Sequence, residues 1–257
     1  MSRQLEDSLA RFIDESPGNR LEAHGGIAIY GRPLLGVARA ADPLFDRLRD
    51  VGAPHHRSPA SWLPGAKTVF SYFLPFTEAV RASNRHLGLP SKEWCGGRIE
   101  GEALNDEARR FLVESLQAEG FRAVAPPLAP GYGVRDLAAN WSERHAAYIA
   151  GLGTFGLSAS LITSRGAAGR FGSVVTDLEC SPTPRPRGSH HADCPWLTRR
   201  ECGDCIARCP AGAISAEGKD KEICRRYLDE VVKPRFAPRY GCAKCQVGVP
   251  CEAGIPG

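Results

Sequence analysis

The sequence of 257 residues has little that would direct the chain into or across a membrane. Its first residues, MSRQLEDSLARFIDES, mix both charges and lack the apolar core of a secretory signal. A charge-free run does extend from Ala146 to Thr163. Glycines and serines interrupt this run and its second half alternates, which favours a buried helix, turn and strand over a membrane span. We therefore expect a cytoplasmic protein.

Strong charge is also missing. The formal net charge is +4, which permits a nucleic-acid or other anionic partner but does not require one. Hydrophobic residues make up 42% of the chain and charged residues 24%, the proportions of an ordinary globular protein. This composition excludes a largely disordered chain.

Cysteine is rare before residue 194, where only Cys95 and Cys180 occur, and abundant after it. Eight of the ten cysteines fall in the last 64 residues, and eight thiolates is the number that two four-coordinate clusters require. The run CGDCIARCP, from Cys202 to Pro210, has the C-x2-C-x3-C-P ending of the bacterial iron–sulfur motif. The sequence therefore predicts two [4Fe-4S] clusters.

The spacing also predicts which cysteines share a cluster. In such a run the cysteine before the proline serves the other cluster, and the later pair Cys242 and Cys245, followed by Cys251, supplies the reciprocal set. For the first cluster we expect the ligands Cys194, Cys202, Cys205 and Cys251. For the second cluster we expect Cys209, Cys224, Cys242 and Cys245.

Other uses of these cysteines explain less of the pattern. A single structural zinc held by Cys202, Cys205, Cys242 and Cys245 would leave four cysteines unused, and a zinc-stabilised binding module stays as the outside alternative. A disulfide framework needs an oxidising compartment, which nothing in the sequence indicates. Cys95 and Cys180 lie away from the motif, so we expect free or packed thiols there.

Upstream of the cysteines, helices and strands are expected to alternate in an α+β domain with a central sheet. Helices are predicted over residues 4–14, 42–48, 104–116 and 142–149, and strands over 67–73, 121–125, 158–163 and 171–176. Residues 77–101 are predicted to be irregular. The stretch SPTPRPRGSHH, residues 181–191, is predicted to be a linker, which gives two domains, 1–185 and 186–257.

Three glycines, Gly151, Gly153 and Gly156, match the pattern G-x-G-x-x-G. A dinucleotide-binding fingerprint follows a strand and opens a helix, whereas here a helix is expected before the glycines and a strand after them. We therefore reject a dinucleotide site. The glycines still indicate that the backbone comes close to another element or to a planar cofactor.

Four stretches together resemble the epoxyqueuosine reductase-like family, whose relatives include the reductive dehalogenases. They are LPGAKTVF from Leu63, SERHAAYIAGLGTFGL from Ser142, RFGSVVTD from Arg170, and the cysteine-rich tail. The resemblance implies a nitroreductase-like α+β domain that holds a cobalamin, joined to a ferredoxin-like domain with two [4Fe-4S] clusters. It further implies an electron donor of the ferredoxin or flavodoxin type, and it is compatible with a small-molecule or modified-nucleoside substrate and with tRNA.

Departures from the family pattern fall at the site residues. Arg199 stands where the first cysteine of the family motif is expected, so Cys194 takes its place, and Glu252 rather than a proline follows Cys251. The family's catalytic aspartate precedes the pair matching Glu143 and Arg144, and Asp136 is the nearest acid, one residue off. The resemblance thus makes Asp136 the expected proton donor.

Two functions follow from these observations. The first is a corrinoid-dependent reductase with Asp136 as proton donor and Gly151, Gly153 and Gly156 against the cofactor. The alternative is an electron-transfer or corrinoid-activating protein without a substrate of its own. In that case Asp136 would have a structural role, for example pairing with Arg135 or Arg144.

Overall fold

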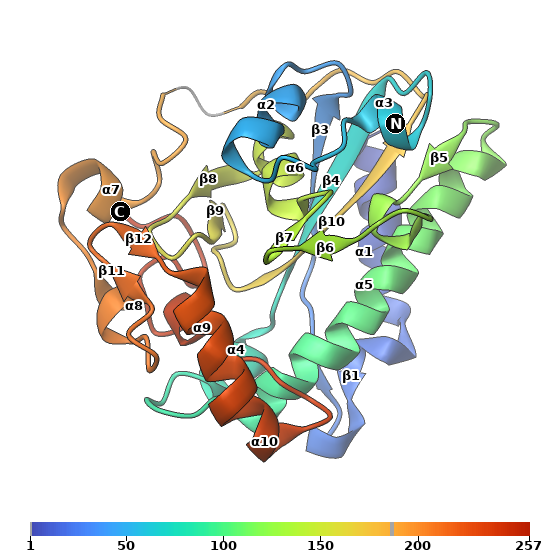
Figure 1. The fold of residues 1–257 in the computed structure, drawn as a ribbon. Coiled ribbons are helices and arrows are strands. Elements are labelled where there is room, and N and C mark those ends of the chain that lie inside the picture. The colour runs from blue at the N-terminus through green and yellow to red at the C-terminus, as the bar shows by residue number, and fades with distance from the viewer. Residues whose placement is uncertain (1, 186–187) are drawn as a thin grey trace.

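A computed structural model describes residues 2–185 and 188–257 of the chain. Its centre is a four-stranded antiparallel sheet in the order β3-β4-β10-β5 (Figure 1). The strands are β3 (Leu34–Arg39), β4 (Thr68–Pro75), β10 (Gly169–Thr176) and β5 (Ala123–Val124). Every residue of β4 is buried, and it pairs with β10 along its whole length. These two strands are therefore the centre of the core.

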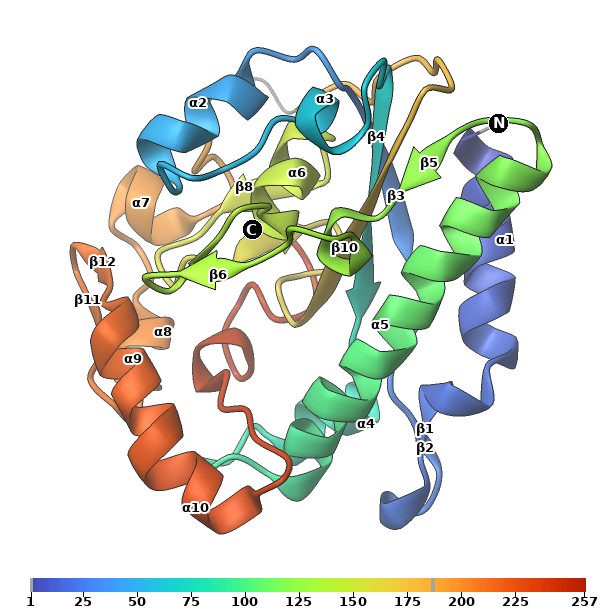
Figure 2. The same cartoon turned by 45° about the vertical axis from the view of Figure 1, so that its right-hand side comes forward.

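Helices cover both faces of this sheet (Figure 2). The helices α1 (Ser2–Glu15) and α5 (Lys92–Ala118) pack on one face, against residues such as Phe70, Tyr72 and Val174. The helices α2 (Leu44–Val51) and α6 (Glu143–Ile149) pack on the other, against Val69 and Val175. Alternate strand residues point to opposite faces, so the continuous apolar strands predicted from the sequence fit a sheet buried on both sides. The α+β prediction is confirmed at this level.

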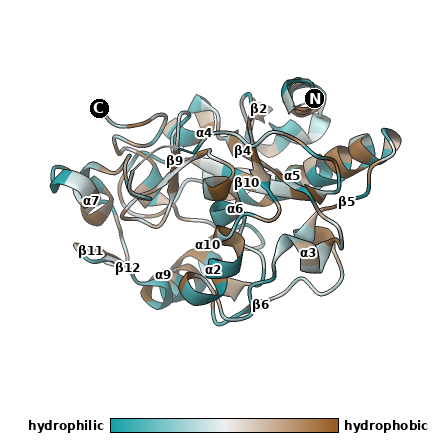
Figure 3. Cartoon of the chain, turned by 90° about the horizontal axis from the view of Figure 1, so that it is seen from above, coloured by the Kyte–Doolittle hydropathy of each residue, from teal (hydrophilic) through white to brown (hydrophobic). Residues whose placement is uncertain are grey.

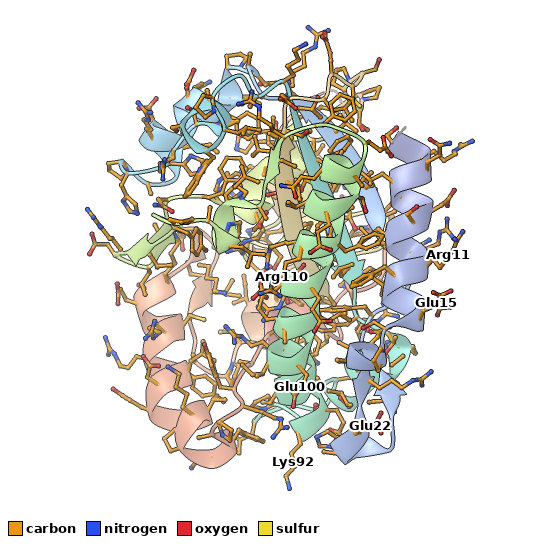
Figure 4. All side chains as sticks on the ribbon, turned by 90° about the vertical axis from the view of Figure 1, so that its right-hand side faces the viewer. Arg11, Glu15, Glu22, Lys92, Glu100 and Arg110 are labelled. Carbon is orange, nitrogen blue, oxygen red and sulfur yellow. The ribbon has the colours of Figure 1, made fainter. Side chains whose placement is uncertain are left out.

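The helix α1 is amphipathic, as predicted. Leu5, Leu9 and Ile13 are buried against the sheet layer, and Figure 4 shows Arg11 and Glu15 on the outer side of the helix. The helices of the molecule carry hydrophilic and hydrophobic residues together in Figure 3. Such a pattern is typical of helices that bury only one face.

The prediction that residues 77–101 are irregular is wrong. They contain α4 (Glu78–Ser83) and the first turns of α5, which Ser91 caps by accepting a hydrogen bond from Trp94 N at 3.0 Å. Glycines at 96, 97 and 101 disfavour a helix by propensity. Here they allow close packing, since a Cβ atom on Gly101 would lie 2.5 Å from the Tyr30 hydroxyl. Tertiary packing therefore overrides local preference.

Several short strands form two-stranded hairpins beside the main sheet. They are β1 (Arg20–Leu21) with β2 (Ile27–Ala28), β6 (Val134–Arg135) with β7 (Ala138–Ala139), β8 (Gly153–Phe155) with β9 (Leu161–Thr163), and β11 (Ile214–Ser215) with β12 (Gly218–Lys219). The strand predicted from residue 158 begins only at Leu161, because Ala159 lies in a left-handed turn with φ of 58°. The glycine segment follows a helix, as predicted, but Gly153–Phe155 within it forms the strand β8, which was not predicted.

The cysteine-rich tail is built from short helices. They are α7 (Pro195–Arg199), α8 (Asp204–Ala207), α9 (Lys221–Tyr227) and α10 (Lys233–Phe236), with a π-helical turn, Leu228–Val232, joining the last two. The remaining helical segments are α3 (Pro59–Trp62) and the 3-10 turns Pro17–Asn19, Glu22–His24, Pro126–Leu128 and Lys244–Gln246. Within the part of the chain that the structure describes, no helix is long and apolar enough to cross a membrane.

The predicted linker is anchored at its start. Thr183 donates from its backbone N to Val37 O at 2.9 Å, and its hydroxyl accepts from Val37 N at 3.0 Å, so this segment lies along the edge of β3. Residues 186–187, next to the predicted boundary, lie outside the described residues. The division into domains 1–185 and 186–257 stays a prediction.

Candidate functional site

Four of the eight tail cysteines line one small pocket. Cys194 precedes α7 as its N-cap, Cys202 and Cys205 lie before and within α8, and Cys251 lies in the C-terminal turns. Side chains such as Leu157, Ile162 and Trp196 form other parts of the wall. These four cysteines are the ones predicted from spacing for the first cluster.

Two thiols in this pocket, Cys205 and Cys251, are hard to ionise without a bound cation. Burial, and then the neighbouring thiols, raise the pKa of Cys205 to about 12. Burial and the nearby Cys194 and Cys202 likewise raise the pKa of Cys251 to about 12. Metal binding requires thiolates and releases their protons, so a cationic cluster would relieve this penalty. The pocket therefore suits a metal centre chemically.

The other four cysteines form a second neighbourhood. Burial, together with the nearby thiols of Cys245, Cys224 and Cys209, raises the pKa of Cys242 to about 11. Cys224 comes from α9. Cys242 precedes the 3-10 turn Lys244–Gln246, and Cys245 lies within it. Ala213 N donates a hydrogen bond to Cys209 Sγ at 3.2 Å. Hydrogen bonds to cysteine sulfur tune iron–sulfur centres, so this donor fits the predicted chemistry.

The described residues do not form a site for a single metal ion. Among residues 2–185 and 188–257, no three His, Cys, Asp or Glu side chains are grouped so that they could hold one metal ion. A [4Fe-4S] cluster is larger than an ion, and its four ligands stand around it rather than at one point.

Cys95 lies closer to the tail cysteines than its sequence position suggested. It is buried in α5, and its Sγ donates to Gly241 O at 3.4 Å, next to Cys242. Burial, and then the proximity of Cys242, raise the pKa of its thiol to about 12. The distance along the chain was therefore a poor guide to its surroundings, although a packed thiol was the expected role. Cys180 is half-buried beside the linker.

Buried polar contacts fasten the second cysteine group to the N-terminal part. Lys244 is 1% exposed, and its Nζ donates to Asn84 O at 2.9 Å and to His86 O at 2.6 Å. Asn84 in turn donates from Nδ2 to Cys242 O at 2.9 Å. Nearby, buried Glu252 accepts from Arg85 at 2.6 Å and from Gly248 N at 2.6 Å. The residue that replaces the family proline therefore has a structural partner.

Asp136 lies at the tip of the β6–β7 hairpin and is exposed. Asp136 and Leu137 have φ of 49° and 55°, so both turn residues are left-handed, a conformation that disfavours leucine. Arg144, one proposed partner of Asp136, instead donates to Ala159 O at 2.6 Å. Strained turns of this kind occur at functional loops, and the role of Asp136 stays a prediction.

The three glycines of the 151–156 turn face the protein's own chain. A Cβ atom would lie 2.9 Å from Pro184 O at Gly151 and 1.9 Å from Ile162 O at Gly153. At Gly156 it would lie 3.2 Å from the Ile162 side chain. Close packing of another element, one of the two explanations offered by the sequence, accounts for all three glycines without a cofactor.

A polar site, separate from the two cysteine groups, lies at the open edge of β10. The partner strand β5 pairs only with Val175 and Thr176, so β10 has no strand neighbour on that side at Phe171. The side chains of Asn105 and Arg109 reach from α5 and donate to Phe171 O at 3.1 and 3.2 Å. The backbone edge that the sheet leaves open is thus filled by polar side chains.

Glu143, the first residue of α6, meets Arg109 at this edge. One oxygen of the Glu143 carboxylate accepts from Arg109 at 3.2 Å, and the other accepts from the Ser173 hydroxyl at 2.5 Å. Trp141 Nε1 donates to the same Ser173 hydroxyl at 2.9 Å. Burial raises the pKa of Glu143 from 4.5 to about 7, although Arg109 and Ser173 oppose the shift. A carboxyl group that titrates near neutral pH is suited to acid–base chemistry.

Comparison with known proteins identifies the fold. No family model and no curated protein matches the sequence. Among solved structures, an epoxyqueuosine reductase in complex with an epoxyqueuosine-modified tRNA stem loop matches 98% of this chain at 16% identity and a TM-score of 0.57. The Bacillus subtilis enzyme, with its catalytic loop swung out of the active site, matches the whole chain at 17% identity and a TM-score of 0.57. This is the epoxyqueuosine reductase fold.

Reductive dehalogenases share that fold. A catabolic reductive dehalogenase matches 87% of this chain at 14% identity and a TM-score of 0.60. The chain spans about two thirds of the epoxyqueuosine reductases, 66% and 68% of their lengths, and only 30% of the dehalogenase. At these identities the likeness establishes the fold of the present chain and leaves its chemistry to be argued from its own residues.

Sequence reasoning missed the polar site at the β10 edge. Glu143 stood inside the segment that carries the family resemblance, but no role was assigned to it. A usable signal existed in α5, where Arg98, Glu102, Asn105 and Arg109 recur at helical spacing and face one side. It was hidden because Gly96, Gly97 and Gly101 made the beginning of that helix look irregular.

Proposed function

We propose that the protein is an iron–sulfur oxidoreductase that binds two [4Fe-4S] clusters through its eight tail cysteines. The first set is Cys194, Cys202, Cys205 and Cys251, and the second is Cys209, Cys224, Cys242 and Cys245. The observation that carries this proposal is the pocket lined by all four cysteines of the first set. The shared fold with epoxyqueuosine reductases and reductive dehalogenases supports the same class of function.

The chain's own residues would do three things for these clusters. The thiolates would hold them, the apolar walls around Leu157, Ile162 and Trp196 would limit access of water to the first, and Ala213 N would donate to sulfur at the second. When bound, such clusters supply one-electron transfer. In this proposal the tail is a ferredoxin-like domain and residues 1–185 a nitroreductase-like domain.

We further propose that the N-terminal domain uses these electrons for a corrinoid-dependent reduction. One dehalogenase of this fold is described as suggesting a mechanism for B12-dependent dehalogenation. Asp136 is the candidate proton donor, because it is the acid nearest to the position of the family's catalytic aspartate. It lies on an exposed, left-handed turn. The catalytic loop of the Bacillus subtilis enzyme has been captured away from its active site. A comparable movement would bring Asp136 towards a substrate.

The alternative is an electron-transfer or corrinoid-activating protein that acts on no substrate of its own. The packing of Gly151, Gly153 and Gly156 against Pro184 and Ile162 favours it, since these glycines then need no cofactor. In either case the electrons come from an external donor of the ferredoxin or flavodoxin type. A modified nucleoside is the first substrate to test, because one protein of this fold was solved with a modified tRNA stem loop.

Cobalamin binding separates the two functions. The protein is purified without oxygen, its iron is measured, and cobalamin is added while the visible spectrum is recorded. A corrinoid-dependent reductase should change the cobalamin spectrum, and Asp136→Asn should keep that binding while turnover of an epoxyqueuosine-modified tRNA stem loop falls about a hundredfold. Asp50→Asn, a change at another exposed aspartate, should retain turnover. Full iron content without cobalamin binding would leave only the electron-transfer function.

A further inference from the structure

Three carboxylates meet around one guanidinium group in the polar site at the β10 edge. Arg109 is 3% exposed and lies 3.0 Å from Glu102, 2.5 Å from Asp106 and 3.2 Å from Glu143. Arg170 lies 3.4 Å from Glu102. Carboxylates that share one guanidinium group repel one another, which favours the binding of a proton by one of them.

We propose that Glu143 is an internal proton donor for the reduction that the protein carries out. This inference rests on the proposed function and adds a second acid to Asp136. Of the three carboxylates Glu143 is the least exposed, at 15% against 35% for Asp106 and 40% for Glu102. Water stabilises its charge least, so the proton belongs on Glu143.

Its hydrogen-bond partner suits both protonation states. Trp141 Nε1 can only donate, so Ser173 Oγ accepts there and is free to donate its own proton to the ionised Glu143. When Glu143 is protonated, the same hydroxyl can rotate and accept from the acid. Release of the proton leaves a carboxylate that Ser173 and Arg109 stabilise. The group can therefore give up and regain a proton without repacking.

Tyr30 also belongs to the polar site. It is 2% exposed, and its hydroxyl lies beside the Arg170 guanidinium, with Glu102 and Arg109 in electrostatic reach. Burial raises the pKa of Tyr30 well above its usual value. The hydroxyl therefore stays protonated and adds no negative charge to the site.

Other groups around Glu143 set the pH range. Arg109, Glu102 and Asp106 face it from α5, Tyr72 from β4, Ser173 from β10 and Tyr132 from the loop before the β6–β7 hairpin. Burial outweighs Arg109 and raises the pKa of Glu143 to about 7. Below that pH the donor holds its proton. As the pH rises through 7 it loses the proton, and the rate of reduction should fall.

The chemistry balances with the electrons that the clusters deliver. A two-electron reduction of a substrate takes up two electrons, one at a time, and two protons. Glu143 supplies one of the two protons and Asp136 the other. Each becomes a carboxylate and regains a proton from solvent water before the next cycle. The external ferredoxin- or flavodoxin-type donor is oxidised by two electrons in total.

Infrared titration of the carboxyl groups tests the inference directly. Between pH 5 and pH 9 the wild-type protein should lose one protonated-carboxyl band near pH 7, and Glu143→Gln should lack that band. Ser173→Ala removes a hydrogen bond that lowers the pKa, so the band should persist to higher pH. Turnover by Glu143→Gln at unchanged iron content should fall about a hundredfold, whereas exposed Glu114→Gln should match the wild type.

These experiments distinguish failure of the proton-donor role of Glu143 from failure of the proposed function. A wild-type protein without a carboxyl titration in that range, or a Glu143→Gln variant with full turnover, overturns the donor role and leaves the reductase standing. A wild-type protein that holds its iron but reduces no substrate and binds no cobalamin overturns the proposed function, and the donor role with it.

Discussion

At the scale of single residues, Cys194 is the ligand whose assignment depends most on the structure. Cys194 lies eight residues before Cys202 in the sequence. The family motif would have its cysteine three residues before Cys202, at position 199. In the structure the Cys194 side chain lines the same pocket as Cys202, Cys205 and Cys251. Arg199 lies at the end of α7, on the surface, and pairs with Glu201. Cys194, and not Arg199, therefore lies in the pocket wall.

Replacing Cys194 by alanine should remove one cluster and leave the other. The second cysteine group does not include Cys194, so the variant should retain about half of the wild-type iron. Iron analysis of anaerobically purified protein provides the measurement. Cys180→Ala is the matched control and should keep all of its iron. If Cys180→Ala lost half the iron and Cys194→Ala lost none, the ligand sets would be wrong.

The sequence was informative about residues whose chemistry depends on local spacing, and silent about those that depend on tertiary contact. The C-x2-C pairs predicted cysteines that lie together, and the structure places Cys202 and Cys205 in one pocket with Cys194 and Cys251. Glu143, Ser173 and Arg109 come from three elements and meet at a sheet edge. No pattern within one element could predict that meeting.

At the scale of elements, the 3-10 turn that begins at Lys244 fixes the second cysteine group to the body of the protein. The Lys244 ammonium group donates hydrogen bonds to Asn84 O and His86 O, which belong to the segment after α4. Asn84 is fully buried and returns a bond to Cys242 O. The contact links two segments that are about 160 residues apart in the chain.

Lys244→Met should loosen this contact and destabilise the protein. Methionine has a similar length but no donor, so two carbonyl groups would lose a partner, at a cost of about 1–3 kcal/mol each where they stay buried. Urea unfolding without oxygen measures the change in the free energy of unfolding. Lys92→Met, at an exposed position of α5, should change it by less than about 0.5 kcal/mol. Equal stabilities of the two variants would argue against an anchoring role.

Helices and strands were predictable where their apolar residues recurred at a regular spacing or formed a continuous run. The spacing of Leu5, Leu9 and Ile13 predicted α1, and the β-branched and aromatic residues of β4 predicted a core strand. The beginning of α5 was missed because its glycines are selected by contacts with Tyr30 and Phe76, which only the folded chain brings together. The β6–β7 hairpin was missed because Asp136 and Leu137 are not the usual residues of a left-handed turn.

At the scale of the whole molecule, the fold brings the cysteine-rich tail against an α+β core whose sheet is buried on both faces. The polar site of Glu143 lies at one edge of that sheet, and the β6–β7 hairpin with Asp136 lies nearby in the chain (Figure 1). The general class was predictable from alternating helices and strands. The docking of residues 181–185 along β3 was not, because a proline-rich composition does not reveal its contacts.

The central claim is that the eight tail cysteines hold two [4Fe-4S] clusters. Metal analysis of the wild-type protein, purified without oxygen, combined with its visible spectrum, tests it most directly. The account predicts a brown protein with about eight iron atoms and no stoichiometric zinc per chain. A colourless protein that contains zinc and no iron would contradict it.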